Sequence, residues 1–501
     1  IKEQLWNNLE KLGLKEQIKT IEVKPPGFIN FFFSQTALVD TVKTVLKQGS
    51  NFGRQKVGLK KKIQIEFVSA NPTGPLSVAH GRQAAVGDAL ANILKFLGYR
   101  VTREYYVNDE GTQIDILGQS IQSRLKEILG KPAVFPEEGY QGEYIYDIAR
   151  DILKNTTAAD QDKLAGNDIK FFSQYGVKYI LKTIIDDLEV FSVNFEVWSR
   201  QSQITRQGSV KKVIESLRKK GFIYDKEGAG WFKSTAFGDD KDRVVIKSDG
   251  SFTYLAPDIA YHQNKFDRGF KWVINIWGPD HHGYIPRLKA AVLALGKPAD
   301  SLSVIIVQLA TLFKEGKPVS MSTRRGQYIS LREVMDEVGR DAARFFFLMR
   351  RVESHLDFDL ELAKKQSPEN PVYYIQYAHA RIANILSNAK SVGLRKINPS
   401  RNKISNGVNP QLLKSDEELG LMRQLANFPE ALLACQKLLD PFSLVNYLLE
   451  LAADFHKFYD RNRVLSEDKD LTASRLVLIE AVRVVLATGL KLLGIAAPDK
   501  M

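Results

Sequence analysis

The sequence predicts an α/β fold in which a doubly wound parallel sheet with inserted helical segments is followed by an all-α bundle. The first indication is a β-α-β pattern: an apolar run at 63–68, a helical period of three and four over 79–97, and a second strand-like run at 99–107. A parallel strand pair joined by a right-handed crossover helix is the unit of doubly wound sheets. The second indication is that almost every segment after Asn370 has helical periodicity.

The expected elements fall into three domains, as a length of 501 residues suggests. The first is small and basic, with helices near 5–14 and 36–46 and a turn and strand between them. The second holds the sheet, and the third is the helical bundle. The expected boundaries are 1–60, 61–368 with a mainly helical insertion at about 113–235, and 369–501. Further strands of the second domain are expected within 242–256, 271–278 and 301–310.

Composition is that of a soluble globular protein, with 44% hydrophobic and 26% charged residues. The single cysteine, Cys435, excludes an internal disulfide and a cysteine-ligated zinc site, and it favours a reducing cytoplasm. The longest apolar stretch, 476–497, is interrupted by charges, so no membrane span is expected. The net charge of +13 is concentrated early, with twelve Lys or Arg against five Asp or Glu over 1–62. That excess indicates either a nucleic-acid partner or a solvated basic surface.

The joint between the first strand and its helix, "SANPTGPLSVAHGRQAAVGD" at 69–88, has unusual chemistry for a strand–helix connection. Helix amino termini that follow parallel strands bind phosphate through free N–H groups and the helix dipole. Gly74 and Gly81 permit close backbone approach, and His80 can donate to a phosphate oxygen. The alternative is a tight loop with an internally bonded histidine. The segment is neither a P-loop nor a GxGxxG motif.

"ANPTGPLSVAHGR" resembles the first signature of class I aminoacyl-tRNA synthetases, and the chain is similar to the bacterial arginyl-tRNA synthetase family along nearly its whole length. The segments that carry the resemblance, in order, are "GFINFFFS", "GDALANILKFLGYRV", "YYVNDEGTQI", "GDDKDRVVIKSDGSFTYLAPDIAYH", "WGPDHHGY", "MSTRRG", "DAARFFFLMR" and "YIQYAHARI". The resemblance implies a Rossmann-like class I catalytic core, an amino-terminal domain that binds the tRNA elbow, and a helical anticodon-binding domain. Because the chain starts at Ile1, we expect the amino-terminal domain to be partial.

The reaction implied by the resemblance is the ATP-dependent attachment of L-arginine to tRNA(Arg) through an arginyl-adenylate, with release of pyrophosphate and AMP. ATP would enter with Mg²⁺, and no zinc is expected. The implied catalytic residues are Ser77, His80, Met321, Ser322, Thr323 and Arg324. The implied ATP-binding residues are Gly74, Pro75, His80, Gly81, Gly278, Asp280, His281 and His282. The Asp-His-His run is not expected to bind a metal, because adjacent side chains on a strand face opposite ways.

Both signatures depart from the family pattern. Ser77-Val78-Ala79-His80 stands where the family usually has His-x-Gly-His, and the Met321 segment lacks both lysines of Lys-Met-Ser-Lys-Ser. Losing one transition-state donor costs on the order of 10²–10³ in rate, which is small beside the acceleration that enzymes achieve. The Ser77 hydroxyl and nearby cations can replace part of what is missing. We therefore predict an active enzyme.

An arginine substrate requires acids, because a guanidinium carries five hydrogen-bond donors and no acceptor. By resemblance, Glu66 and Asn71 receive the ammonium or carboxylate region of the substrate, and Tyr254 and Asp258 receive the guanidinium. The alternative for Asp258 is an acid that only stabilises a helix start.

Contacts with tRNA are expected on the bundle. Tyr373, Tyr377 and Arg381 recur every four residues opposite an apolar stripe, and Tyr459 and Arg463 are also four apart. Aromatic and arginine side chains stack on unpaired bases, although a tyrosine stripe also suits a protein core. We expect a monomer.

Two other functions stay open at this point. A non-catalytic tRNA-binding paralogue is favoured by the altered signatures and disfavoured by the intact set of candidate arginine ligands. A class I synthetase for another amino acid is the second, and lysine fits the charge of the pocket as well as arginine does.

Overall fold

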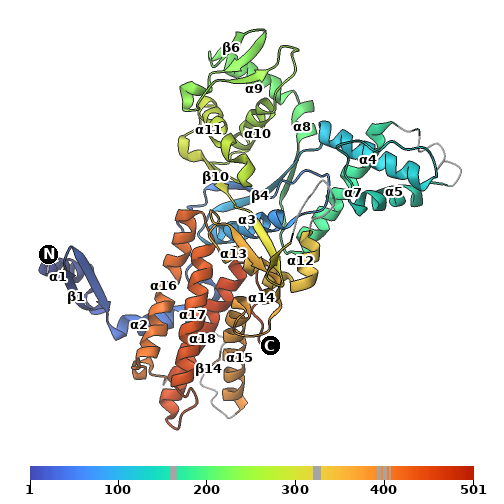
Figure 1. Cartoon of the computed structure of the whole chain (residues 1–501). Coiled ribbons are helices and arrows are strands. Elements are labelled where there is room, and N and C mark those ends of the chain that lie inside the picture. The colour runs from blue at the N-terminus through green and yellow to red at the C-terminus, as the bar shows by residue number, and fades with distance from the viewer. Residues whose placement is uncertain (158–165, 167, 320–328, 392–396, 399–402, 405–407) are drawn as a thin grey trace. The chain divides into compact units, whose positions relative to one another are not determined.

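A five-stranded parallel sheet forms the centre of the unit that spans Lys56–Lys364 (Figure 1). The computed structural model describes residues 1–157, 166, 168–319, 329–391, 397–398, 403–404 and 408–501. The second unit combines Ile1–Gln55 with Lys365–Met501.

The first strand of this sheet along the chain is also its middle strand in space. Its strands are β3 (Lys62–Glu66), β4 (Arg100–Val107), β5 (Val197–Arg200), β9 (Trp272–Trp277) and β10 (Leu302–Ile306). Their spatial order is β10-β9-β3-β4-β5, and every neighbouring pair is parallel. The chain runs outward from β3 to β4 and β5, then returns to place β9 on the other side of β3. The crevice above the carboxyl ends of β3 and β9 is therefore the topological switch point, where ligands of such sheets bind.

The two faces of the sheet differ in chemistry. Ile63 and Ile65 of β3 are fully buried on one face, which helix α3 (Val78–Phe96) covers. Glu66 lies on the opposite face, because side chains alternate along a strand, and there it meets helix α10 (Leu255–Asp267). The sheet thus has an apolar layer on one side and a buried polar layer on the other.

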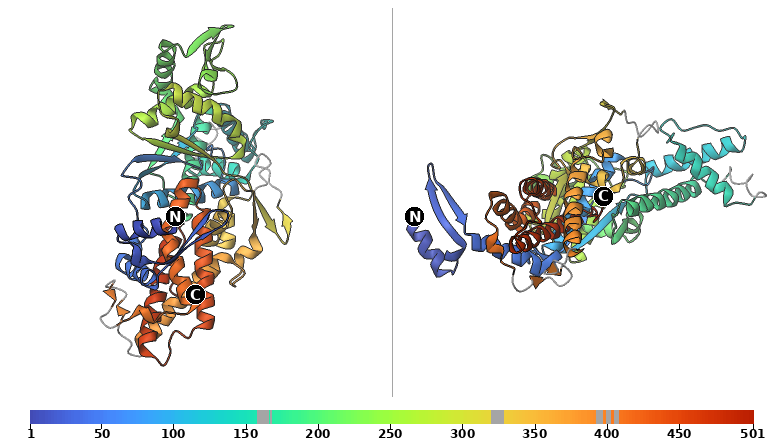
Figure 2. Two further views of the ribbon diagram at one scale, coloured as in Figure 1. Left: turned by 90° about the vertical axis from the view of Figure 1, so that its left-hand side faces the viewer. Right: turned by 90° about the horizontal axis from the view of Figure 1, so that it is seen from below.

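The helical insertion is shorter than the sequence indicates. Helices α4 (Thr112–Ile128), α5 (Glu143–Lys154) and α7 (Ile169–Val190) lie side by side (Figures 1 and 2). The expectation that all of 113–235 is an insertion needs correction, because β5 lies within this range and is the edge strand of the parallel sheet. The next elements are α8 (Gln201–Arg206), α9 (Ser209–Lys219), β6 (Ile223–Lys226), β7 (Ala229–Phe232) and β8 (Arg243–Ile246).

Two of the runs in which strands are expected contain elements with other boundaries. The run 242–256 supplies only β8, which joins β6 and β7 in an antiparallel sheet, and α10 already begins at Leu255. The run 301–310 ends β10 at Ile306, and Ala310 starts a strand of another sheet. The remaining elements of this unit are α11 (Ile285–Ala294), β11 (Ala310–Lys314), β12 (Lys317–Pro318), α12 (Leu331–Val338), α13 (Arg340–Leu348), β13 (Leu356–Asp359) and α14 (Leu360–Lys364).

The other unit joins the start of the chain to the helical bundle. Its first elements are α1 (Lys2–Lys11), the antiparallel pair β1 (Ile18–Lys24) and β2 (Phe28–Phe33), and α2 (Gln35–Gln48). Helix α2 packs on two helices of the bundle, α16 (Asp416–Leu438) and α18 (Lys469–Leu492), and the buried Phe52 stacks on Phe428. The Gln35 side chain also donates to the carbonyl oxygens of Gln411 and Leu413, at 3.0 and 2.8 Å. Residues just before the sheet-containing unit along the chain are therefore built into the bundle.

Four long helices make the bundle: α15 (Pro371–Ser391), α16 (Asp416–Leu438), α17 (Phe442–Arg461) and α18 (Lys469–Leu492) (Figure 1). The short strands β14 (Ile397–Asn398) and β15 (Lys403–Ile404) pair between α15 and α16. The expected apolar stripe of α15 is confirmed for Ile375, Ala378 and Ile382, which are fully buried. In the described part of the chain, no helix is long and apolar enough to span a bilayer.

Candidate active site

A cavity of about 600 Å³ opens at the switch point of the parallel sheet. It brings together side chains from the end of β3, the start of α3, the start of α10 and the loop after β9. The predicted residues among its lining are Glu66, Asn71, His80, Tyr254, Asp258, Gly278, Asp280 and His281. The fold therefore brings all four candidate arginine ligands and four of the eight candidate ATP ligands, which are up to 215 residues apart, around one cavity.

Asp258 lies in the first turn of α10, facing the cavity. Its Oδ2 accepts a hydrogen bond from the Tyr284 hydroxyl at 2.5 Å. Burial raises the pKa of Asp258 to about 6, and the Tyr284 hydrogen bond offsets part of that rise. Tyr254 stands just before the helix and is 77% exposed at the rim. The alternative reading of Asp258 as a helix-start acid is incomplete, because its carboxylate lines the cavity.

Glu66, at the carboxyl end of β3, is the second acid of the cavity. Its Oε2 accepts from Lys265 Nζ at 2.5 Å, and its Oε1 accepts from Ser69 Oγ at 3.2 Å. Asn71 stands nearby in the loop after the strand and also lines the cavity, with its Nδ2 donating to Gln113 Oε1 at 2.7 Å. One acid is thus paired with a protein cation, whereas within the described residues the Asp258 carboxylate accepts from a neutral hydroxyl, that of Tyr284.

His80 lies in the first turn of α3, at the third position after Ser77, which is the N-cap residue of the helix. The Ser77 backbone N–H donates to His80 Nδ1 at 3.1 Å. Burial lowers the pKa of His80 to about 4, so the ring is neutral near pH 7. A neutral imidazole that accepts at Nδ1 carries its proton on Nε2. His80, which lines the cavity, therefore offers it an N–H donor.

The loop after β9 is tight. A Cβ on Gly278 would lie 2.6 Å from Asp280 Oδ1, so this position has no room for a side chain without moving that carboxylate. Asp280 Oδ2 lies 3.3 Å from His281 Nε2, and both side chains are mostly exposed. His282 is exposed and is not among the residues that line the cavity.

Besides His282, three more residues predicted to bind ATP do not line the cavity. Gly74 and Pro75 belong to the loop before α3, and neither lines it. Gly81 is buried on the packed side of the helix, where an added Cβ would lie 2.7 Å from Leu331 Cδ1 and 3.1 Å from a ring carbon of Phe347. A glycine is needed here for helix packing, so the structure offers no phosphate-facing position at Gly81. The predicted residues Met321, Ser322, Thr323 and Arg324 lie outside the described residues.

Sequence reasoning missed three polar side chains: His262 and Asn275 line the cavity, and Lys265 lies behind them. Lys265 is fully buried and also donates to Asn275 Oδ1 at 3.0 Å. Asn275 Nδ2 in turn donates to His262 Nε2 at 2.9 Å, and His262 Nδ1 donates to the Asp258 carbonyl oxygen at 2.8 Å. A signal was present: residues four and seven positions after Asp258 share its helix face. The described residues include no group of three or more His, Cys, Asp or Glu side chains arranged to hold a metal ion.

A second candidate surface lies on the helical bundle. A hollow of about 820 Å³ is lined by residues that include Tyr377, Arg381 and Tyr459. The Arg381 guanidinium sits between the two rings, 4.5 Å from each ring centroid, and its Nη2 donates to the Tyr377 hydroxyl at 2.8 Å. Tyr373 stacks on Tyr377 with centroids 5.9 Å apart. Four of the five predicted tRNA contacts therefore form one continuous cluster.

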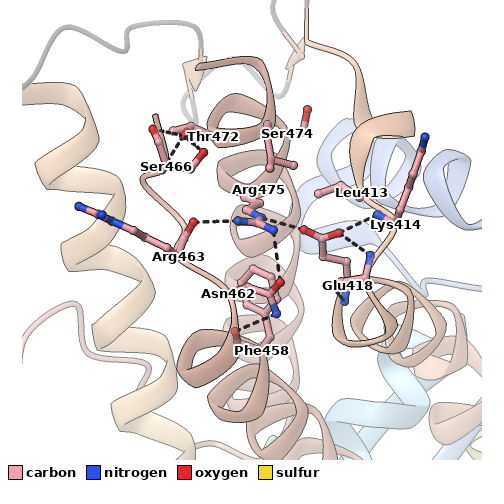
Figure 3. Close-up of polar contacts among 12 residues, drawn as sticks. Leu413, Lys414, Glu418, Phe458, Asn462, Arg463, Ser466, Thr472, Ser474 and Arg475 are labelled. Carbon is pink, nitrogen blue, oxygen red and sulfur yellow. Dashed lines mark hydrogen bonds and ion pairs between the residues drawn. The ribbon is translucent and has the colours of Figure 1, made fainter. Parts of the chain in front are cut away.

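Arg463, the fifth, lines an adjoining hollow of about 610 Å³ that shares Tyr459 with the first. Arg475 of α18 holds the loop that carries it: Nη1 donates to the Arg463 carbonyl oxygen at 2.9 Å, and Nη2 donates to Asn462 Oδ1 at 3.2 Å. Arg475 Nε also donates to Glu418 Oε1 at 2.8 Å. Figure 3 shows the Arg463 side chain directed away from Arg475 and its hydrogen-bond partners. The loop backbone is thus fixed from inside the bundle while the side chain stays outside.

Comparisons with known proteins agree with this architecture. Residues 41–355 match the family model of class I tRNA synthetase catalytic domains of the arginine type, and residues 375–501 match the DALR anticodon-binding domain. Arginine–tRNA ligases from Citrifermentans bemidjiense and Geobacter sp. are 49% and 48% identical over 492 residues, covering 98% of this chain and 87% of each relative. The arginyl-tRNA synthetase structure from Thermus thermophilus shares the fold, with a TM-score of 0.76 at 21% identity, covering 99% of this chain and 93% of that one.

The fold and these matches define a class I aminoacyl-tRNA synthetase, a ligase with a helical anticodon-binding domain. Within that class, the chain belongs to the arginyl-tRNA synthetase family. The family and the fold class predicted from sequence are confirmed, and none of these matches favours a non-catalytic paralogue.

Proposed function

We propose that this chain joins L-arginine to ATP as arginyl-adenylate and then transfers the arginyl group to tRNA(Arg). In the first step a substrate carboxylate oxygen attacks the α-phosphorus and the bond to pyrophosphate breaks. In the second step a terminal tRNA hydroxyl attacks the arginyl carbonyl carbon and AMP leaves. The observation that carries the proposal is the convergence of Glu66 and Asp258 on one cavity that also holds His80 and Gly278.

Asp258 is assigned to the guanidinium. Its carboxylate faces the cavity without a protein cation on it among its described contacts, so a planar substrate cation can supply the missing charge. Tyr254 at the rim is assigned to the same end of the substrate. Glu66 and Asn71 are assigned to the ammonium or carboxylate region.

ATP is assigned to the side of the cavity formed by His80 and the Gly278 loop. His80 donates from Nε2, and its low pKa keeps that donor neutral across the physiological range. Ser77, Asp280 and His281 are proposed to assist, and residues 321–324 remain a proposal from sequence. Positioning and charge stabilisation supply most of the acceleration in phosphoryl-group chemistry.

Mg²⁺ is proposed to arrive with ATP. The described residues do not assemble a dedicated metal site, whereas Mg²⁺ commonly keeps several waters and binds through substrate phosphates. We therefore assign no step to a protein-bound metal, and we propose that no zinc takes part.

For tRNA we propose that Tyr373, Tyr377, Arg381, Tyr459 and Arg463 contact unpaired bases, and that the basic segment 1–62 contacts phosphates. A tyrosine–arginine cluster beside a hollow suits base stacking. Affinity carried by phosphates should fall steeply with salt. A monomer in the cytoplasm is proposed as well, and the single buried thiol of Cys435 fits a reducing compartment.

The direct test is charging of tRNA with each of the twenty radiolabelled amino acids in the presence of ATP. Arginine alone should be attached; attachment of lysine, or of nothing, would overturn the proposal. In a second test, Asp258→Ala should raise the KM for arginine far more than the KM for ATP. Equal effects on both constants would contradict the assignment of Asp258.

A further inference from the structure

Lys265 is an unusual residue to find behind a pocket for a cation. It lies on α10, two turns after Asp258, and its side chain is fully buried. Its Nζ donates to Glu66 and to Asn275 and lies 4.3 Å from the centroid of the Tyr261 ring. Lys265 is not among the residues that line the cavity. It therefore acts on the substrate only through other groups.

Its contacts connect the two acids of the pocket. The ammonium group needs acceptors, so it fixes the Asn275 amide with Oδ1 toward itself and Nδ2 toward His262. That amide donor requires a lone pair on His262 Nε2, which leaves the proton on Nδ1 to bond the Asp258 carbonyl oxygen. Burial and the Lys265 charge lower the pKa of His262 well below its ordinary value, so this tautomer is neutral. One buried cation thus orders both Glu66 and the first turn that carries Asp258.

Lys265 also sets the charge of the pocket. Glu66 and Asp258 contribute two negative charges and Lys265 one positive charge, so the three side chains sum to −1. Arginine carries an ammonium, a guanidinium and a carboxylate, and sums to +1. Without Lys265 the two acids would carry a charge of −2, which suits a doubly charged cation that lacks the carboxylate of arginine.

We propose that Lys265 is a positioning residue for arginine recognition, which orders Glu66 and the Asp258 turn and matches the charge of the pocket to a net monocation. This inference rests on the proposed binding of arginine in this cavity. The structure also offers a matched control at the C-cap of the same helix. Arg268 Nη2 donates to Glu104 Oε1 at 2.8 Å, and Glu104 is fully buried one strand away but does not line the cavity.

The experiment compares Lys265→Met with Arg268→Met in tRNA charging at pH 8. Lys265→Met should raise the KM for arginine roughly 10²-fold, as a misplaced positioning group does, while the KM for ATP and for tRNA change less than threefold. Arg268→Met should leave all three constants within threefold of the parent. Thermal unfolding of both variants shows whether they are folded.

Agmatine, which is arginine without its carboxylate, reports the charge directly as a competitive inhibitor. In Lys265→Met the ratio of the agmatine Ki to the arginine KM should fall roughly 30-fold, the factor for two unit charges at roughly 8 Å and an effective dielectric constant of about 20. General loosening of the pocket would weaken both ligands and leave the ratio unchanged.

The double variant Glu66→Gln/Lys265→Met restores the charge of −1 without an ion pair, and such paired replacements are often tolerated in cores. Its agmatine-to-arginine ratio should return to within threefold of the parent, while the arginine KM stays high. The inference is overturned if Lys265→Met behaves like Arg268→Met, or if its ratio does not move. If instead the parent chain itself fails to charge tRNA with arginine, it is the proposed function that fails.

Discussion

Lowering the pH should selectively weaken the use of arginine, because Asp258 must be ionised to bind a guanidinium. Burial places the pKa of this carboxyl at about 6, against about 3.9 for an unperturbed aspartate. The charged form needed for binding is therefore present above pH 6 and is lost as the pH falls through that value. The guanidinium of the substrate stays protonated throughout.

The size of the effect follows from the ionised fraction. With a pKa of about 6, that fraction is about 0.97 at pH 7.5 and about 0.09 at pH 5.0, so kcat/KM for arginine should fall roughly tenfold. Two histidines that line the same cavity, His80 and His262, add no step in this range. The pKa of His80 is lowered to about 4 and that of His262 is lowered well below its ordinary value.

The assay is the initial rate of tRNA charging at limiting arginine, with ATP and tRNA saturating, from pH 5.0 to 7.5. Asp258→Asn serves as the control, because it cannot titrate and should give a flat, low profile. A parent profile that is flat over this range, or an Asp258→Asn profile that keeps the tenfold fall, would refute the reasoning. Circular dichroism at each pH shows whether the fold persists.

The raised pKa of Asp258 affects folding stability in the opposite direction to its effect on activity. Between about pH 4 and pH 6 the folded state holds a proton on Asp258 that the unfolded chain has released, so this group's contribution to stability falls as the pH rises through that window. In Asp258→Asn the thermal midpoint should lose this component of its pH dependence. If the pH dependence of the thermal midpoint is the same in the variant as in the parent, the pKa of Asp258 is not raised by burial.

Three further substitutions test separate parts of the structure. His80→Ala removes the Nε2–H donor and should lower kcat/KM for ATP by about 10²–10³; a loss smaller than tenfold in charging assays would count against the assignment. Gly81→Ala adds a Cβ 2.7 Å from a leucine methyl and should cost about 1–3 kcal/mol of folding free energy; an unchanged thermal midpoint would show that the neighbours yield freely. Tyr459→Ala removes one of the two rings that contact the Arg381 guanidinium. The KM for tRNA should rise by about 5- to 150-fold, as expected for about 1–3 kcal/mol of base stacking, while the KM for ATP stays constant. Equal changes in both constants would point to a structural role instead.

Sequence patterns predicted the switch point of the sheet because its position follows from local rules. Strand β3, the helix after it and the strand β4 were readable from periodicity, and a switch point follows from the order in which strands are laid down. Patterns failed where an element depends on distant partners. The edge strand β5 has only four residues and is defined by pairing with β4, and the Gly81 position is set by side chains from α12 and α13.

By itself, the sequence determined the family, the parallel sheet, the helical bundle, and the identities of the acids and the histidine that meet at the switch point. These properties are encoded in short-range periodicity and in motifs whose residues are neighbours along the chain. Only the tertiary structure decided that Asp258 is bonded to Tyr284 and that Lys265 neutralises Glu66. Charge balance and pKa depend on which groups share a buried space, and Glu66 and Lys265 share one only because segments about two hundred residues apart pack against the same sheet.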